Sequence, residues 1–210
     1  YEIYKEYKAN REKDFYNRLE PKDPELYIQK QRVIQYCEEL FIRQFQDEII
    51  EADDSIGYYC SNISEDEKIV IVSNDRDMCQ LIDERVAVYV INLRKIISKD
   101  NYGENFNHHY TNVKLIKILS GDASDNIKGI RGIKEKTLIN YFPEICEKTL
   151  TLKDIISKIE VLQSERKTRL KTLDNIINRV TIGCQGVDIF DVNEKIINLR
   201  KPLLTESAKE

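Results

Sequence analysis

Apolar residues recur every three or four positions in "PELYIQKQRVIQYCEELFIRQF", residues 24–45. This spacing places apolar side chains on one face of a helix. Asp23 is suited to cap such a helix and Pro24 to occupy its first position. The positions expected on the shared face are Leu26, Val33, Cys37, Leu40 and Phe41. The pattern predicts a long amphipathic helix.

Two other stretches have the apolar pattern of strands. The segment "KIVIVS", residues 68–73, is a β-branched run bounded by charge, which predicts a strand buried on both faces. The segment "RVAVYVINL", residues 85–93, predicts a second strand, and "EADDSIGYYCSN", residues 51–62, predicts a short helix. Strands separated by helical segments favour parallel pairing, with functional groups at the carboxyl ends of the strands.

After residue 110 the pattern indicates helices only, within residues 112–121, 134–142, 151–162 and 168–182. The expected fold class is therefore α/β, with a parallel sheet flanked by helices and a helical C-terminal part. We expect two domains, one over residues 1–110 and one over residues 111–210.

Composition narrows the classes of protein that remain. With 210 residues, 41% of them hydrophobic, the chain is long enough for one sizeable core. The five cysteines lie far apart and form no C-x-x-C pair, which suggests neither a disulfide framework nor a zinc site and fits a reducing cytoplasm. No apolar run approaches the roughly 18 residues that cross a bilayer, so no membrane partner is expected.

Acidic residues gather at the expected ends of three elements. They are Glu51, Asp53, Asp54, Asp75, Asp77, Asp122 and Asp125. The last two would share one face if their segment is helical. Like charges repel, so a cluster of this kind is tolerable mainly when a divalent cation neutralises it. Oxygen ligands without His or Cys favour Mg²⁺ or Mn²⁺, and two such ions can clamp the attacking and leaving oxygens of a phosphodiester.

A less specific interpretation of the acids stays open. Each acidic pair taken alone is more often a solvated surface or a helix cap. The net charge of −4 argues at face value against a nucleic-acid partner, but it becomes +3 when the seven acids are set aside. Outside the candidate site the chain is therefore mildly basic.

A glycine-rich basic turn follows the last acids in "GIRGIKEKT", residues 129–137. Gly129 and Gly132 have no Cβ, so backbone N–H groups at the start of the next helix can approach a phosphate. A G-x-x-G turn is weak evidence alone, because KH domains and structural turns also contain it. The residues expected to contact nucleic acid are Gly129, Ile130, Arg131, Gly132, Ile133, Lys134, Lys136 and Thr137.

The motifs "EADD", "VSNDRDMCQLI", "GDASDNIKGIRGIKEKT" and "YKANR" together resemble the 5'-nuclease superfamily, the flap endonucleases and 5'-3' exonucleases, and most closely its bacteriophage members. The likeness spans residues 1–145 in the same order. It implies a PIN-like α/β domain with a helix-three-turn-helix that binds duplex DNA. It also implies that the seven acids are metal ligands, and that the turn is a DNA-binding hairpin whose backbone carbonyls hold K⁺.

The resemblance assigns a role to the start of the chain as well. Residues 1–22 match the arch through which a single-stranded 5' end passes, and Lys8 and Arg11 match its basic residues that assist at the scissile phosphate. By sequence alone both would be ordinary solvated charges. In the family, a first strand with one metal-binding aspartate and a second aspartate precede "YKANR", so we expect the metal site of this chain to be incomplete.

These observations predict a structure-specific 5'-3' exonuclease or flap endonuclease that uses two Mg²⁺ or Mn²⁺ ions. Its expected partners are DNA with a 5' flap or 5' end, RNA–DNA hybrid and replication proteins, as in primer removal during phage replication in the cytoplasm of the infected host. Two alternatives stay open. One is a module that binds branched DNA without cutting it, and the other is a PIN-type ribonuclease, which would not need the hairpin.

Overall fold

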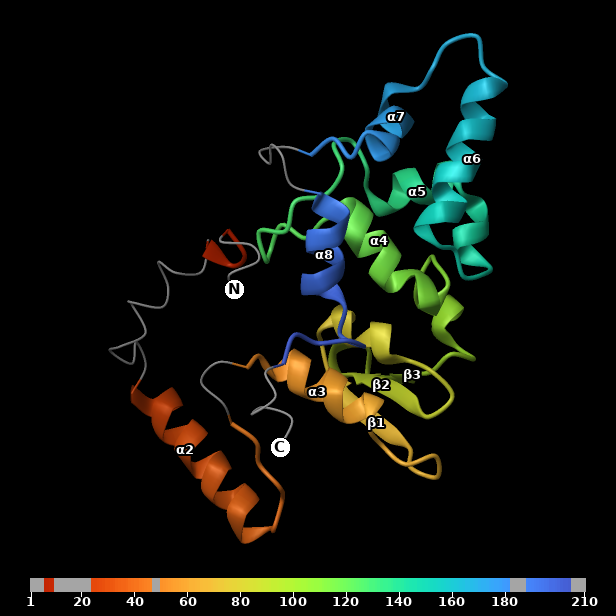
Figure 1. Ribbon diagram of the computed structural model, residues 1–210. Coiled ribbons are helices and arrows are strands. Elements are labelled where there is room, and N and C mark those ends of the chain that lie inside the picture. The colour runs from red at the N-terminus through yellow and green to blue at the C-terminus, as the bar shows by residue number, and fades with distance from the viewer. Residues whose placement is uncertain (1–5, 10–23, 47–49, 182–187, 205–210) are drawn as a thin grey trace.

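The computed structural model describes residues 6–9, 24–46, 50–181 and 188–204, and it has a small sheet at one end and a group of helices at the other (Figure 1). The α-helices are α2 (Pro24–Glu39), α3 (Ala52–Ser61), α4 (Val113–Ser120), α5 (Glu135–Tyr141), α6 (Leu152–Ser164), α7 (Lys171–Ile177) and α8 (Ile189–Ile197). The strands are β1 (Ile69–Ser73), β2 (Val86–Val90) and β3 (Lys95–Ile97). Short 3₁₀ helices are η2 (Arg76–Leu81), η3 (Ile91–Leu93), η4 (Tyr102–Glu104), η5 (Tyr110–Asn112) and η6 (Pro143–Cys146).

The sheet has the order β1-β2-β3. Strands β1 and β2 pair in parallel, as the sequence predicts, and Ile69 lies opposite Val86 in their register. Strand β3 was not predicted, and it pairs antiparallel to β2. The sheet is therefore mixed. The chain reverses at Arg94, whose left-handed backbone, at φ 52°, directs β3 back along β2.

The expectation that the first strand is buried on both faces is wrong. Ile71 in β1 is buried, whereas Val70 and Val72 are 50% and 65% exposed. These two side chains share the opposite face of the strand because successive residues alternate. That face is uncovered in the part of the chain that the structure describes, and β1 lies at the edge of the sheet.

Helix α2 forms where the apolar spacing predicts it, but it is shorter than residues 24–45 and none of its residues is buried. It ends ahead of Phe41, whose φ of 56° is left-handed and incompatible with a continuing helix. Figure 1 shows α2 standing apart from the other helices. Its apolar side chains are therefore largely exposed, with Leu26 at 49% and Val33 at 58%, and Leu40 directly after it is 69% exposed.

Buried apolar residues form two clusters. One lies around the sheet and includes Ile71, Val88 and Tyr102. The other lies among the helices α4 to α8 and includes Leu119, Leu138 and Ile159. The division of the chain into domains at residue 110 stays a prediction.

The chain returns to the sheet after α8. Leu199 is buried in the sheet cluster, and its backbone passes so close to Gly57 of α3 that a Cβ there would lie 2.0 Å from the Leu199 carbonyl oxygen. Arg200 then donates from Nε to the carbonyl of Gln80 and from Nη2 to that of Ile82, both at 3.0 Å. The last helix is thus tied to the element that follows β1.

The helices of the described residues include none that is long and apolar enough to span a membrane.

Candidate functional site

Asp75 and Asp77 lie where β1 ends, as predicted. The Asp75 carboxylate caps η2 by accepting from the backbone N–H of Asp77 at 2.8 Å, and its own N–H donates to Ser73 Oγ at 2.9 Å. Asp75 is exposed and Asp77 is half-buried. This local turn is what directs Asp77 inward from the carboxyl end of the strand.

The "GDASDN" segment is a closed loop rather than the helical turn that the spacing of Asp122 and Asp125 suggests. Gly121, at φ 70°, ends α4, since few other residues adopt this backbone conformation. Asp122 and Ile127 then exchange backbone hydrogen bonds of 2.9 and 2.7 Å across the loop. The expected helical spacing of the two aspartates is therefore wrong, although both still reach the site.

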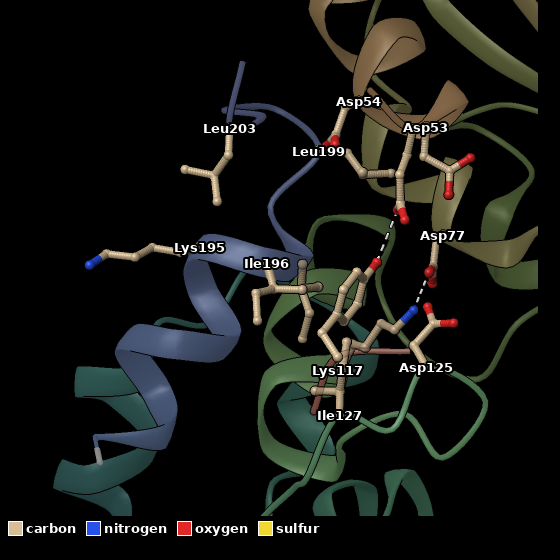
Figure 2. Close-up of a pocket in the computed structure, with 13 residues that line it drawn as sticks. Asp53, Asp54, Asp77, Lys117, Asp125, Ile127, Lys195, Ile196, Leu199 and Leu203 are labelled. Atoms are coloured by element: carbon tan, nitrogen blue, oxygen red, sulfur yellow. Dashed lines mark hydrogen bonds and ion pairs between the residues drawn. The ribbon is translucent and has the colours of Figure 1, made fainter. Parts of the chain in front are cut away.

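Three carboxylates from two distant segments converge. Asp77, Asp122 and Asp125 each offer a ligand atom, and these atoms lie within 4.8 Å of one another. Figure 2 shows Asp53, Asp77 and Asp125 on one side of a pocket near Lys117. The acids that line this pocket are Glu51, Asp53, Asp54, Asp77 and Asp125. The carboxylates that the sequence groups by element ends are thus gathered in space, with Asp75 and Asp122 beside the pocket.

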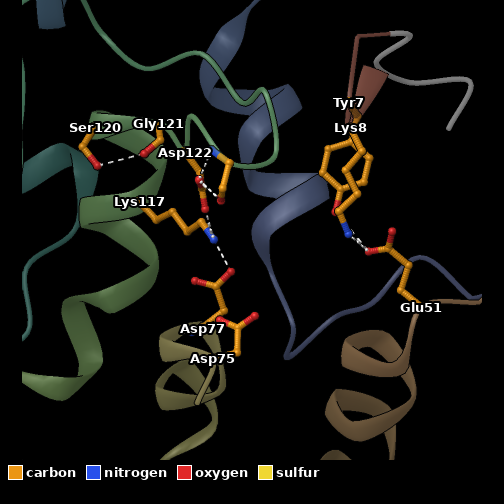
Figure 3. Close-up of polar contacts among 10 residues, drawn as sticks. Tyr7, Lys8, Glu51, Asp75, Asp77, Lys117, Ser120, Gly121 and Asp122 are labelled. Atoms are coloured by element: carbon orange, nitrogen blue, oxygen red, sulfur yellow. Dashed lines mark hydrogen bonds and ion pairs between the residues drawn. The ribbon is translucent and has the colours of Figure 1, made fainter. Parts of the chain in front are cut away.

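Lys117 was missed by the sequence interpretation and is the cation at the centre of the acids. Its Nζ lies 2.8 Å from Asp122 Oδ2 and also forms an ion pair with Asp77 (Figure 3). Only 12% of its side chain is exposed. The available signal was its place in the last turn of the helix that leads directly into Asp122.

The acids differ in how readily they ionise. Burial raises the pKa of Asp77, and Lys117 offsets this only in part. Burial would also raise the pKa of Asp122, but hydrogen bonds from Lys117 and Ser124 outweigh it and lower that pKa to about 2. Burial, then the nearby charge of Asp75, raises the pKa of Asp53. The site therefore holds more negative charge than Lys117 neutralises.

This donor set fits a hard divalent cation. All of its ligand atoms are carboxylate oxygens, which Mg²⁺ and Mn²⁺ prefer over nitrogen or sulfur. Burial first, and neighbouring carboxylates second, raise the pKa values of Asp53 and Asp77, and a divalent cation would stabilise the ionised forms of both groups.

Of the two basic residues assigned to the arch, Lys8 lies at the site and Arg11 lies outside the described residues. Lys8 Nζ pairs with Glu51 Oε2 at 2.6 Å, and the Tyr7 hydroxyl donates to the same oxygen at 3.0 Å (Figure 3). The backbone N–H of Lys8 also donates to the carbonyl of Asp125 at 2.9 Å. The Lys8 ammonium is thereby held at the edge of the acidic pocket.

Residues of the glycine-rich turn divide between core and surface. Ile130 and Ile133 are buried, so their side chains support the turn from below. The N–H groups of Ile130, Arg131 and Ile133 are taken by backbone carbonyls. The exposed residues are Arg131, Gly132, Lys134 and Lys136, and Thr137 is half-buried.

The two glycines of the turn serve the fold in different ways. A Cβ on Gly129 would lie 2.2 Å from the backbone carbon of Ser120, so this glycine allows the turn to pack against the end of α4. Gly132 has a φ of 84°, and a Cβ there would make only ordinary contact, 3.4 Å from Thr172 Cγ2. Because of the close approach at Gly129, a recess of about 270 Å³ joins the turn to the acid loop at Asp122.

Comparisons with known proteins agree with this geometry. The family model of the 5'-3' exonuclease N-terminal resolvase-like domain matches residues 1–109. The chain is 32% identical over 163 residues to a 5'-3' exonuclease of Buchnera aphidicola subsp. Schizaphis graminum, covering 77% of this chain and 53% of that protein. It is 26% identical over 207 residues to a 5'-3' exonuclease of Halalkalibacterium halodurans, and the match covers 92% of this chain and 67% of that protein.

Among solved structures, the D15 flap endonuclease of bacteriophage T5, in a pseudo-enzyme-product complex with DNA and metal ions, is similar with a TM-score of 0.66. The two chains are 21% identical, and the match covers 95% of this chain and 69% of that one. A T5 5'-exonuclease with divalent zinc ions bound is similar with a TM-score of 0.63. These likenesses show that the fold is shared.

The fold is that of a nuclease-type α/β protein. The chain belongs to the family of the 5'-3' exonuclease N-terminal resolvase-like domain, whose model covers more than half of it. This confirms the superfamily predicted from the motifs. The chain spans 53% of the length of the Buchnera relative.

Proposed function

We propose that this protein hydrolyses phosphodiesters near the 5' ends of DNA, as a metal-dependent 5'-3' exonuclease or flap endonuclease. The observation that carries the proposal is the convergence of Asp77, Asp122 and Asp125 within 4.8 Å in a family of 5'-3' exonucleases. The metal-bound T5 structures support it. A single surface pair of acids would not require two distant segments of the chain to meet.

Two Mg²⁺ or Mn²⁺ ions would be held by the clustered acids. The ligands assigned to them are Glu51, Asp53, Asp54, Asp75, Asp77, Asp122 and Asp125. Bound divalent ions lower the pKa of water and stabilise the attacking and leaving oxygens of a phosphodiester.

The protein's own cations would hold the DNA beside the acids. Lys8 and Arg11 would contact the scissile phosphate from the arch side. Lys117 balances part of the carboxylate charge, which allows an anionic backbone to approach the site. Lys8 and Lys117 are fixed positive charges at the place where negative charge would accumulate.

The glycine-rich turn would grip the duplex a fixed distance from the acids. Arg131, Lys134 and Lys136 are exposed on it, and the recess beside Gly129 links them to Asp122. The buried side chains of Ile130 and Ile133 leave the turn's exposed backbone as the contact surface. We assign α4, the turn and α5 to the helix-three-turn-helix, with K⁺ held by backbone carbonyls of the turn.

The cellular role proposed for this activity is removal of RNA primers, so RNA–DNA hybrid at a 5' end is a second substrate. Replication proteins would be the partners in that role, in phage replication within the host cytoplasm. The division into domains at residue 110 would place the acids of β1 and the hairpin in separate units.

Cleavage of 5'-flap DNA with a labelled 5' end tests the proposal. It is measured with Mg²⁺ or Mn²⁺ on the chain and on the chain extended by the family's first strand. We expect the chain to cleave the flap DNA. Asp77→Asn should abolish this cleavage, and Asp66→Asn should leave it unchanged. Flap binding without cutting in either form would favour the binding module, and cutting of unstructured RNA without regard to 5' ends would favour the PIN-type ribonuclease.

Binding of duplex DNA tests the hairpin separately. Lys134→Ala combined with Lys136→Ala should weaken binding and lower the slope of log affinity against log salt by about 2, since each phosphate contact contributes about 0.9. Lys153→Ala on α6 is the matched control. If the salt slope of the double variant is unchanged, the turn does not contact the duplex DNA.

A further inference from the structure

A second recess opens beside the acid site and is not used by the function proposed above. It has a volume of about 530 Å³, within the range that small ligands occupy. Asp77, Lys117 and Asp122 form the wall that it shares with the acidic cluster. Its other side is formed by Arg76 of η2 and by residues that follow β3, among them Phe106 and His108.

Three side chains form a stack on that far side. The rings of Tyr102 and Phe106 are stacked with centroids 4.6 Å apart and an interplanar angle of 29°. The guanidinium carbon of Arg76 lies 5.7 Å from the centroid of Phe106. The outermost member of the stack is therefore a flat, exposed cation at the recess.

The inner end of the stack is rigid. Tyr102 is 2% exposed, and its hydroxyl shares a hydrogen bond of 2.9 Å with His108 Nε2. The other ring nitrogen of His108, Nδ1, lies 3.1 Å from Glu135 Oε1 at the start of α5. Because both ring nitrogens are engaged, His108 fixes Tyr102, and Tyr102 supports the ring of Phe106.

The outer end of the stack is available to a ligand. Arg76 is exposed, and no carboxylate of the described residues forms an ion pair with it. A guanidinium plane supported by an aromatic ring is a surface on which nucleobases stack. Asn107 is exposed beside it and offers an amide donor and an amide acceptor.

The charges of the recess favour an uncharged group over a phosphate. Asp77, Asp122 and Glu135 contribute carboxylates to its wall, and Lys117 is already paired with the first two. The one cation of the recess that has no carboxylate partner in the described chain is Arg76. A phosphate would meet more negative than positive charge there, whereas a base would meet a stacking surface.

We propose that this recess seats the base of the nucleotide next to the phosphate being cut, stacked on Arg76 and supported by Phe106. The inference rests on the proposed nuclease activity, because a phosphate at the acid cluster would place its attached nucleoside at the shared wall. Arg76 and Phe106 are then base-binding residues, and His108 is a positioning residue that acts through Tyr102.

Direct binding of 2'-deoxyadenosine 5'-monophosphate, followed by NMR without divalent ions, tests the proposal. Deoxyribose 5-phosphate, which has the same phosphate and no base, is the matched ligand. Arg76→Ala should weaken binding of the nucleotide about tenfold or more, given what one stacked base contributes. Arg76→Lys should weaken it similarly, because lysine keeps the charge but not the plane. Arg166→Ala, an exposed arginine beyond α6, should have no effect.

The outcomes separate this inference from the nuclease itself. Equal binding of the two ligands, full binding by Arg76→Lys, or no shift of recess resonances would overturn the base-binding proposal. If the chain cleaves flap DNA while giving any of these three results, the proposal of nuclease activity still stands. If the chain binds the nucleotide through Arg76 but never cleaves DNA, the base-binding proposal stands and the nuclease proposal is wrong.

Discussion

Lys8 and Glu51, 43 positions apart in the chain, form an ion pair of 2.6 Å between Nζ and Oε2. Tyr7 donates to the same oxygen, so residues 7 and 8 are fastened to the residue that precedes α3. A partly exposed pair of this kind stabilises a fold by about 1 kcal/mol or less. Its main effect is therefore to place the Lys8 ammonium at the acidic pocket.

Lys8→Met should lower the rate of flap cleavage at least tenfold, because a fixed cation near the scissile phosphate is lost, while the free energy of unfolding falls by about 1 kcal/mol at most. Cleavage kinetics and urea unfolding measure the two effects. Lys99→Met removes a surface pair with Glu84 and serves as the control. Unchanged cleavage by Lys8→Met would limit Lys8 to a structural role.

Stability should depend on pH through Asp122, whose pKa is lowered from 3.8 to about 2 in the folded chain. A lowered pKa stabilises the fold at pH values above the unfolded value near 3.8 and loses this effect as pH falls towards 2. The contribution is about 2 kcal/mol at most. Urea unfolding should therefore find Asp122→Asn less stable than the native chain at pH 6, with the difference shrinking steadily below pH 4. A difference that is constant with pH would contradict this.

Divalent cations should stabilise the fold through the clustered acids, independently of any cleavage. At a concentration of Mn²⁺ about a hundred times the dissociation constant, the gain is about 2.7 kcal/mol. Thermal unfolding with Mn²⁺ and with a chelator measures it. Asp125→Asn should remove most of the gain and Asp66→Asn none of it, and an equal gain in both variants would place the ion elsewhere.

Gly57→Ala should destabilise the protein although alanine is the better helix former. Helix propensity favours alanine by about 1 kcal/mol, but the new Cβ would lie 2.0 Å from the Leu199 carbonyl oxygen. Overpacking of this kind costs about 1–3 kcal/mol, so the clash outweighs the propensity. Gly103→Ala, with nothing within 4 Å, is the matched control and should be neutral or slightly stabilising. Equal melting temperatures for the two variants would contradict the packing of Leu199.

The sequence predicted the parts of the site that depend on local order. Asp75 and Asp77 follow a β-branched run. The end of a strand can be located from the residues next to it in the sequence, so the position of these two aspartates was predictable. Lys117 was missed because its role depends on where α4 points relative to η2, which no spacing along the chain records. The shared face of Asp122 and Asp125, expected if their segment were helical, does not form because Gly121 ends α4 directly before Asp122.

Burial was harder to predict than secondary structure. Val70 and Val72 have the pattern of a central strand, but exposure depends on which elements cover a face, and residue type alone does not determine this. Likewise α2 has the apolar spacing of a packed helix and buries none of its residues. Periodicity identified α2, β1 and β2, missed β3, and left the neighbours of each element undetermined.

The return of Leu199 and Arg200 to the sheet makes the two apolar clusters mechanically dependent on each other. Leu199 is a member of the sheet cluster and follows α8, which belongs to the helical one. Melting of the helical cluster would withdraw Leu199 from its place against α3 and Arg200 from the carbonyls beyond η2. The turn that carries Asp77 would then lose its support at the same moment as the glycine-rich turn, so unfolding of the helical cluster cannot leave the acids at the end of β1 in place.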